Sequence, residues 1–428
     1  MKVCPFRGIR YNSGIVKDLA EVICPPYDVI TPSEQKLYYE RSDYNVIRLE
    51  YAMEEPEDSK AGNKYNRAAI TFQQWLKQGV LKVDESPAFY LHDHYFSYLG
   101  VRRRRRGLIA RVKLEPWYSG IHPHEETFAK AKIDRLQLMR ACQANFSPLF
   151  ALYEDPEQQI AHVLSEASRA RPLFDFSEHG EEHVVWAVAD SRFKQEISRL
   201  LTPQTLYMAD GHHRYETALI YQGERAQGVS SAGGNEAFNY VMMTLVDFSD
   251  PGLVIFPIYR LVRGIAPVTL AELKSRLGQF FILGSSPLSD NYISHLKSKI
   301  VGEVIFGVLG LESDSLVMLK PRQGISGVMP EGHSQVYKKV DLSLLNHVIL
   351  EQMLGIVEDE GNITYTVDVD EAYQRVKSGE FQLAFLVAPP RLETIKTIAD
   401  VKDKMPRKST YFYPKLPAGL VINSLEWL

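Results

Sequence analysis

The stretch ADGHHRYETA, residues 209–218, decides how the fold is interpreted. An apolar segment, residues 206–208, runs directly into Asp210 and Gly211, and helix-forming residues follow from Arg214. A strand that ends at a glycine and continues as a helix directs backbone N–H groups and the positive end of the helix dipole toward one point. The histidines and the arginine add further donors there. The stretch therefore predicts a phosphate or other anion site; the alternative is a strand–turn–helix with a polar start.

Composition places the chain among folded proteins with a sizeable core. It has 428 residues, 45% hydrophobic and 24% charged, enough for two or three domains or one elaborate domain. The net charge of -4 creates no field that would recruit nucleic acid, so nucleic acid is not an expected partner. Cys4, Cys24 and Cys142 lack zinc-ligand spacing and predict no disulfide framework. Together with the absence of a signal peptide or a membrane-length apolar run, this predicts a cytoplasmic protein.

Apolar periodicity alternates between helical and extended segments along the chain, which predicts a mixed α/β (α+β) architecture. We expect helices over 65–78 and 133–144, and strands over 46–49, 88–92 and 107–112. Loop composition suggests an N-terminal region over 1–150, a core over 151–264 and a C-terminal region over 265–428. The five arginines at 102–106 lie between two expected strands, and we interpret them as a solvated hairpin tip.

Polar side chains gather in three further clusters that could share one pocket with the anion loop. The clusters are His122, His124, Glu125 and Glu126; Lys132, Asp134 and Arg135; and Lys408, Ser409 and Thr410 with Lys415. Carboxylates, imidazoles and cations are the groups that phosphoryl transfer requires. Each cluster also has a structural interpretation, as a helix cap, a solvated helix face or a core loop. Asp28, after two prolines, is a candidate acid, base or ligand, or it bonds its own turn.

Four motifs in this order resemble a large bacterial and archaeal family known only as a domain of unknown function. They are PPYDVI at 25–30, the His124–Glu125 segment with Asp134 and Arg135, ADGHHR at 209–214, and MPRKSTYFYPK at 405–415. The central motif is also similar to the phosphate-binding box of the ParB/sulfiredoxin superfamily. Within that superfamily, the free-serine kinases carry the same DGHHR sequence.

This resemblance implies a ParB/sulfiredoxin-like core over 151–264 with N- and C-terminal α/β additions. It implies a nucleotide-dependent phosphotransferase, a kinase of a small hydroxy compound, with free L-serine as a candidate acceptor and ATP or ADP with Mg²⁺ as cofactors. Asp210 would bind Mg²⁺ or the substrate hydroxyl and would be catalytic together with His213 and Glu125. Glu125 is the candidate general base because it lies in the most site-like acidic cluster.

The remaining candidate residues divide between nucleotide and acceptor. For the nucleotide they are Gly211, His212, His213, Arg214, Lys408, Ser409, Thr410 and Lys415; for the acceptor they are Asp28, His124, Asp134 and Arg135. Three alternatives stay open: a ParB-like nucleotide-binding regulator or NTPase, a metal-dependent phosphodiesterase or nuclease that uses His122, His124 and Asp210, and a scaffold that binds a partner through its aromatic tail. The sequence leaves the oligomeric state undetermined.

Overall fold

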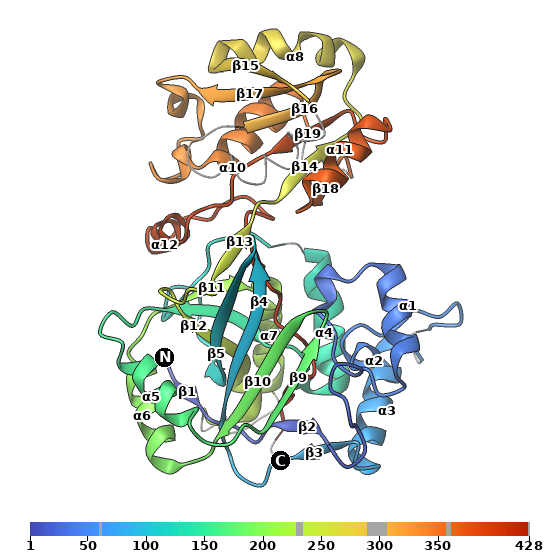
Figure 1. The fold of residues 1–428 in the computed structure, drawn as a ribbon, viewed down its shortest axis with the longest axis vertical. Helices are drawn as coiled ribbons and strands as arrows, with labels where there is room; N and C mark the ends of the chain where they lie inside the picture. The colour runs from blue at the N-terminus through green and yellow to red at the C-terminus, as the bar shows by residue number, and fades with distance from the viewer. Residues whose placement is uncertain (60–61, 128, 228–233, 289–305, 357–360, 427–428) are drawn as a thin grey trace. The chain divides into compact units, whose positions relative to one another are not determined.

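The computed structural model describes residues 1–59, 62–127, 129–227, 234–288, 306–356 and 361–426, and it is a mixed α/β protein (Figure 1). Contacts group the chain into two units. Unit 1 comprises residues 1–123, 127–253 and 414–428, and unit 2 comprises residues 124–126 and 254–413. The division into three regions that the sequence suggests stays a prediction.

Unit 1 is built on a nine-stranded mixed sheet with the order β6-β11-β8-β12-β5-β4-β10-β9, and β1 pairs with β5. The pairs β6–β11 and β8–β12 are parallel, whereas the others are antiparallel. Figure 1 shows β5, β4, β10 and β9 side by side. The strands are β1 Val3–Cys4, β4 Phe89–Tyr98, β5 Val101–Lys113, β6 Ile121–His122, β8 Leu149–Tyr153, β9 Phe174–Glu178, β10 Glu181–Val188, β11 Leu206–Asp210 and β12 Tyr240–Asp247. Two small sheets join β2 Ile9–Tyr11 to β3 Leu81–Val83, and β7 Ala144–Asn145 to β21 Asn423–Ser424.

Helices with recognisable caps accompany this sheet. Thr31 forms a capping box with Glu34 at the start of α1, and Asn63 accepts two backbone N–H groups at the start of α3. Helix α3 packs on α4, and α4 packs on α7. The helices of unit 1 are α1 Pro32–Arg41, α2 Ile47–Glu50, α3 Lys64–Lys77, α4 Ala129–Cys142, α5 Gln159–Ala167, α6 Ser191–Leu201 and α7 His212–Ala226, with 3₁₀ turns at Tyr27–Val29 and Ala237–Asn239.

Three apolar clusters hold the described part of unit 1 together, and the smallest of them contains Tyr90 and Ile109. One lies on the large sheet, where Leu108, Met208 and Leu245 pack against Tyr215 of α7. Another lies among the N-terminal helices and contains Phe72 and Trp75 of α3. Burial of large apolar side chains on both sides stabilises each element by about 25 cal/mol per Å² removed from water. The start of α7 is therefore fixed by its packing on the sheet.

Unit 2 contains a six-stranded antiparallel sheet with the order β15-β17-β16-β19-β14-β18. Leu261, Ala384 and Leu386 lie in its core. Its strands are β14 Tyr259–Val262, β15 Phe281–Pro287, β16 Phe306–Glu312, β17 Ser315–Pro321, β18 Ile363–Thr366 and β19 Leu383–Leu386, and β13 Val254–Phe256 pairs with β20 Tyr411–Tyr413. Its helices are α8 Pro267–Phe280, α10 Asp341–Leu344, a π-helix over Leu345–Met353, α11 Val369–Lys377 and α12 Leu392–Asp400, with 3₁₀ turns at Ile325–Val328 and Tyr337–Lys339. In the part of the chain that is described, no helix has the length and apolar character to cross a bilayer.

The structure confirms the helices expected at 65–78 and 133–144 within about four residues. It also confirms strands at 88–92 and 107–112, but β4 continues to Tyr98 and β5 begins already at Val101. Two interpretations were wrong. The segment 46–49, expected as a strand, is the N-cap and the first three residues of helix α2. The arginine run is part of β5 and not a hairpin tip, because the chain reverses at Leu99 and Gly100 and residues 102–106 pair with β4. Strand alternation points Arg105 into the protein, where it is only 2% exposed.

Candidate functional site

The turn between β11 and α7 places the central motif at the edge of a strand and at the start of a helix. Asp210 is the last residue of β11, and Gly211 has a φ of 94°. A Cβ at Gly211 would lie 3.2 Å from both Nη2 of Arg214 and Cγ of Leu149. The positive φ favours glycine here, and a Cβ would also push against the guanidinium of Arg214. The turn therefore brings Arg214 back toward Asp210.

Asp210 lies between two cations of unit 1. Its Oδ2 accepts a hydrogen bond from Nζ of Lys415 at 3.2 Å and lies 3.8 Å from Nη2 of Arg214. Burial opposes ionisation of Asp210, but the charges of Lys415 and Arg214 outweigh it and hold the pKa of the carboxyl far below its usual range. Asp210 is consequently ionised at neutral pH. Lys415 comes from the C-terminal segment, 205 residues away in sequence.

Arg214 is anchored inside the protein. Its Nη1 donates to Oγ of Ser147 at 2.9 Å and to the carbonyl oxygen of Pro148 at 3.0 Å. Burial alone would lower the pKa of Arg214, but the neighbouring carboxylates of Asp210 and Asp28 raise it. With its donors directed at Ser147 and Pro148, the guanidinium fixes the turn and the position of Asp210.

A buried carboxylate, Glu50 at the end of α2, extends this charge network. It is 3% exposed, and Oγ of Ser147 donates to its Oε1 at 2.9 Å. Burial raises the pKa of Glu50, while the charges of Arg135 and Arg214 oppose that rise. Glu50, Arg135, Ser147 and Arg214 line a cavity of about 40 Å³. This volume suits ordered water but not a nucleotide.

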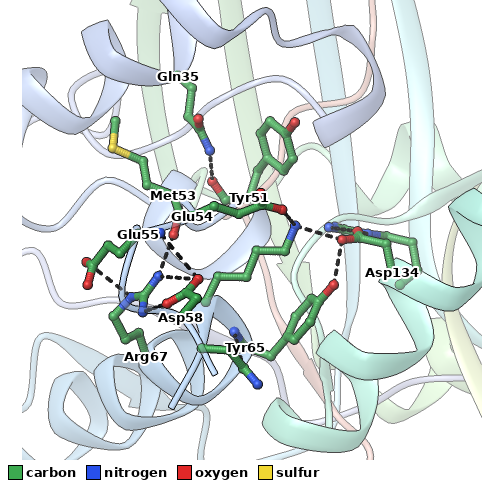
Figure 2. Close-up of polar contacts among 12 residues, drawn as sticks. Gln35, Tyr51, Met53, Glu54, Glu55, Asp58, Tyr65, Arg67 and Asp134 are labelled. Atoms are coloured by element: carbon green, nitrogen blue, oxygen red, sulfur yellow. Dashed lines mark hydrogen bonds and ion pairs between the residues drawn. The ribbon is translucent and has the colours of Figure 1, made fainter. Parts of the chain in front are cut away.

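Arg135 and Asp134, adjacent on α4, bond to each other and to the N-terminal helices. Arg135 donates through Nη1 to the carbonyl oxygen of Glu50 at 2.7 Å, and its guanidinium lies 3.9 Å from the ring centroid of Tyr27. Figure 2 shows Tyr65 directed at Asp134, and its hydroxyl donates to Oδ1 at 2.8 Å. Lys64 forms an ion pair with the same oxygen at 2.9 Å. Arg135 and Asp134 therefore join α4 to α2 and α3.

The histidines of the motif and the residues Lys132 and His122 each have different surroundings. His212 is buried, with its ring 6.4 Å from that of Trp117. His213 is partly exposed, and its carbonyl oxygen accepts from Oγ1 of Thr217 at 2.8 Å. Lys132 forms an ion pair with Glu216 at 2.9 Å. His122 packs its ring between those of Tyr118 and Tyr207.

In unit 2, residues 124–126 bind the loop before β20. The two carboxylate oxygens of Glu125 accept the backbone N–H groups of Lys408 and Ser409 at 3.0 and 3.2 Å. Nε2 of His124 lies 3.0 Å from Oγ1 of Thr410. Lys408 has a φ of 54°, in the left-handed region that favours glycine. The carboxylate of Glu125 thus stabilises a loop 283 residues away in sequence, and not the start of the following helix that the structural interpretation of this cluster expected.

The structure brings the predicted residues together in two groups. Asp210, Arg214, Lys415, Asp134 and Arg135 belong to one network in unit 1, with Asp28 beside it as an exposed side chain. His124, Glu125, Lys408, Ser409 and Thr410 form the second group, in unit 2. The expectation that both groups line one cleft stays a prediction.

Sequence reasoning missed Glu50, Ser147 and Tyr27 as members of the first group. No local pattern marks them, because the partners of Glu50 lie 85 and 97 residues away. For Ser147, the sequence does contain one local indication, because it stands directly before Pro148. This dipeptide is typical of a turn, and that turn supplies the oxygen atoms that hold Arg214.

Comparison with known proteins identifies a family. The family described as "Protein of unknown function (DUF1015)" matches residues 3–345. No curated protein matches the chain. Among solved structures, the free serine kinase in complex with AMP is 14% identical, with a TM-score of 0.35 over 71% of this chain and 86% of that one.

Two further solved structures are similarly distant. A conserved hypothetical protein from Pyrococcus furiosus is 12% identical, with a TM-score of 0.36 over 72% of this chain and 93% of that one. SbnI with a C-terminal truncation, from Staphylococcus aureus, is 11% identical, with a TM-score of 0.33 over 73% and 85%. At these scores the resemblance is distant and carries no argument about function.

Proposed function

The chain belongs to the DUF1015 family of proteins of unknown function, and we propose that it transfers a phosphoryl group from a nucleotide to the hydroxyl group of a small molecule. The observation that carries this proposal is the carboxylate of Asp210, held ionised between Lys415 and Arg214 at the start of α7. Phosphoryl-transfer sites commonly combine a carboxylate, a lysine and the N-terminus of a helix. All three meet at the start of α7, a helix of 15 residues.

We assign the phosphate groups to the start of α7. The first backbone N–H groups of a helix have no partner within the helix, and the helix dipole favours negative charge there. Lys415, 10% exposed beside Asp210, supplies a positive charge at the same turn. His213 and the backbone of Gly211 complete this subsite in the proposal. His212, which is buried, supports the turn from within.

Asp210 receives the acceptor in this proposal. Phosphoryl transfer passes through a loose transition state that needs an oriented hydroxyl more than a strong base. An ionised carboxylate meets the need for orientation, because it accepts the hydrogen bond of the hydroxyl. Its low pKa makes it a weak base, so it takes the proton only late in the reaction, when the hydroxyl has become acidic. Arg214 is then a positioning residue, since its bonds to Ser147 and Pro148 fix the carboxylate.

The residues present are compatible with a nucleotide that carries Mg²⁺. Mg²⁺ usually keeps several waters and binds one or two carboxylates together with substrate phosphates, and Asp210 is an ionised carboxylate beside the proposed phosphate subsite. The ion would neutralise charge on the phosphoryl group. ATP and ADP both carry the required phosphates. The nucleotide would lie outside the 40 Å³ cavity, which is too small for it.

The remaining assignments rest on position. Asp28 is exposed and close enough to raise the pKa of Arg214, so we assign it to the acceptor, with free L-serine as the candidate. Asp134 and Arg135 hold α4 against α3 and α2. For the residues of unit 2 we keep the proposal drawn from the sequence motifs: Lys408, Ser409 and Thr410 contact the nucleotide and His124 contacts the acceptor. Glu125 is the candidate general base if Asp210 only orients the hydroxyl. The large sheet with α7 would be the ParB/sulfiredoxin-like core.

The test is consumption of ATP or ADP by the full chain with Mg²⁺, in the presence and absence of L-serine. Serine-dependent nucleotide consumption with formation of phosphoserine is the expected result. Consumption without serine would instead favour the NTPase alternative. Failure of the chain to bind either nucleotide would overturn the proposal.

A variant test locates the chemistry. Asp210→Asn should lower the rate at least about 100-fold, the range for loss of a proton acceptor, with nucleotide binding retained. Asp175→Asn, which changes an exposed carboxylate on β9 of the same sheet, is the matched control and should leave the rate unchanged. Equal rates in the two variants would remove Asp210 from the reaction.

A further inference from the structure

Three buried histidines lie on the large sheet of unit 1, at strands that the proposed phosphotransfer does not use. His92 and His94 belong to β4 and His183 belongs to β10, and each is at most 3% exposed. One nitrogen of each ring lies within 4.8 Å of the other two. Nε2 of His92 is 2.9 Å from Nδ1 of His183. Buried imidazoles gathered this closely call for a functional explanation.

Strand geometry fixes this arrangement. Residues two apart on a strand point to the same face, so His92 and His94 share a face of β4. The antiparallel register places His183 directly opposite His94. Glu181, two residues before His183, is on the same face of β10, and its Oε2 lies 2.6 Å from Nε2 of His94. The sheet thus gathers three imidazoles and one carboxylate on two adjacent strands.

We propose that His92, His94 and His183 bind a divalent transition-metal ion of the zinc class. Glu181, which contacts His94, becomes the fourth ligand once its carboxylate turns toward the other two rings. Three imidazoles and a carboxylate are a typical donor set for such an ion. Burial lowers the pKa of all three imidazoles, which keeps them in the neutral form that ligates metals. The side chain of Glu181 is 25% exposed, so this carboxylate is the part of the group that reaches solvent.

Two features determine how the ion would bind. The rings of His94 and His183 are stacked, with centroids 4.1 Å apart and planes inclined by 30°. Ligand nitrogens around a tetrahedral zinc lie roughly 3.3 Å apart, so binding turns the rings until their nitrogens face one centre. Arg105 approaches Nδ1 of His94 at 3.4 Å, but its Nη1 donates to the carbonyl oxygen of Pro414 at 2.7 Å. Arg105 is thus held by a hydrogen bond to a backbone oxygen outside the histidine group.

The experiment is a titration of the full chain, stripped of metal by a chelator, with Zn²⁺ by calorimetry and with Co²⁺ by visible absorption. We expect one ion per chain and the intense absorption of a tetrahedral Co²⁺ site with nitrogen ligands. Absence of stoichiometric binding of both ions to the folded chain would overturn the proposal. This measurement needs no variant and does not depend on phosphotransfer.

Variants then place the ion. His94→Gln and His183→Gln should each weaken Co²⁺ binding at least tenfold and remove the tetrahedral absorption. His162→Gln is the matched control, because the His162 side chain is 72% exposed on α5 and should leave binding unchanged. Unchanged binding in folded His94→Gln and His183→Gln, or loss of binding in the control alone, would contradict the assignment.

Discussion

Two regions of unit 1 bury polar side chains on the same sheet in opposite ways. Around the turn between β11 and α7, the groups form a network of ions, in which Glu50 and Arg135 are buried and Asp210 and Arg214 are partly buried. On β4 and β10 the buried groups are the imidazoles of His92, His94 and His183, which burial keeps neutral. In the first region, opposite charges compensate one another. In the second region, the three imidazoles carry no charge.

This difference determines what each region can do. Ions buried in a network keep one another charged, which suits the binding of phosphate and of a polar acceptor. Neutral imidazoles keep their lone pairs, which suits a metal ion. The difference also determines fragility, because removal of one member of a buried ion pair leaves an uncompensated charge, whereas removal of a neutral partner leaves only an unmade hydrogen bond.

The largest effect on stability should come from Arg135→Ala. Arg135 is 5% exposed and lies beside the equally buried carboxylate of Glu50, which the substitution would leave with one cation fewer. We expect a loss of about 3–5 kcal/mol in the free energy of unfolding, the range for breaking a buried pair, measured by urea denaturation. Arg192→Ala, at a side chain that is 77% exposed, is the control and should stay within about 0.5 kcal/mol. Equal losses of stability in the two variants would show that burial of the arginine does not determine the loss.

The second effect is the pH dependence of Asp134. Burial opposes ionisation of Asp134, but Arg135 and Lys64 lower its pKa to about 2. Because the folded pKa lies below the unfolded value, the stabilisation is fully present above the unfolded pKa and is lost as pH falls toward 2. It amounts to about 2 kcal/mol at neutral pH.

Unfolding measured from pH 7 to pH 2 checks this prediction. Asp134→Asn should be less stable than the parent protein at pH 7, and the gap should narrow as pH falls from about 5 to about 2. Asp43→Asn, at a carboxylate that is 95% exposed and paired with Arg48, should show no such gap. A gap for Asp134→Asn that stays constant with pH would exclude its charge as the cause.

The same comparison shows what sequence can predict. Asp210, Gly211 and Arg214 are neighbours in the chain, so a local pattern predicts the strand, the turn and the helix that the structure shows. The anion site expected at this turn stays a prediction. Lys415 was named from its own motif, but its bond to Asp210 joins residues 205 apart. The histidines at 92, 94 and 183 were not singled out, because only the register of β4 and β10 brings them together.

Local pattern also misled where tertiary contacts decide. The segment 46–49 has β-branched residues and was expected to be a strand, yet its end forms the helix that carries Glu50 toward Arg135. The five arginines at 102–106 were expected in solvent because charge runs usually are. Strand alternation instead buries Arg105 against the ring of Phe150 and the carbonyl oxygen of Pro414. Both errors arise where distant partners override local preference.

A smaller effect should come from the histidine region. His183→Gln in the presence of a chelator removes one neutral hydrogen bond to His92 and ring stacking with Phe176. We expect a loss of about 1 kcal/mol, the usual net value of a neutral hydrogen bond, by urea denaturation. His179→Gln is the control, because its side chain is 73% exposed. A loss as large as that for Arg135→Ala would indicate that this region is also held by charge.

The smallest effect should come from Arg102, at the exposed edge of the histidine region. Arg102 pairs with Glu182 across β5 and β10 at 2.6 Å, which is a shorter distance than the 3.9 Å between Arg135 and Glu50. Both side chains are nevertheless exposed, at 63% and 48%, so water screens the pair. Arg102→Ala should cost no more than about 0.5 kcal/mol, and the cost should vanish at about 1 M salt. We expect the pair with the shorter distance to contribute less to stability. Comparing the Arg102 and Arg135 variants therefore distinguishes the effect of ion-pair distance from the effect of burial. A larger cost at Arg102 would make ion-pair geometry, and not desolvation, the property that distinguishes the two regions.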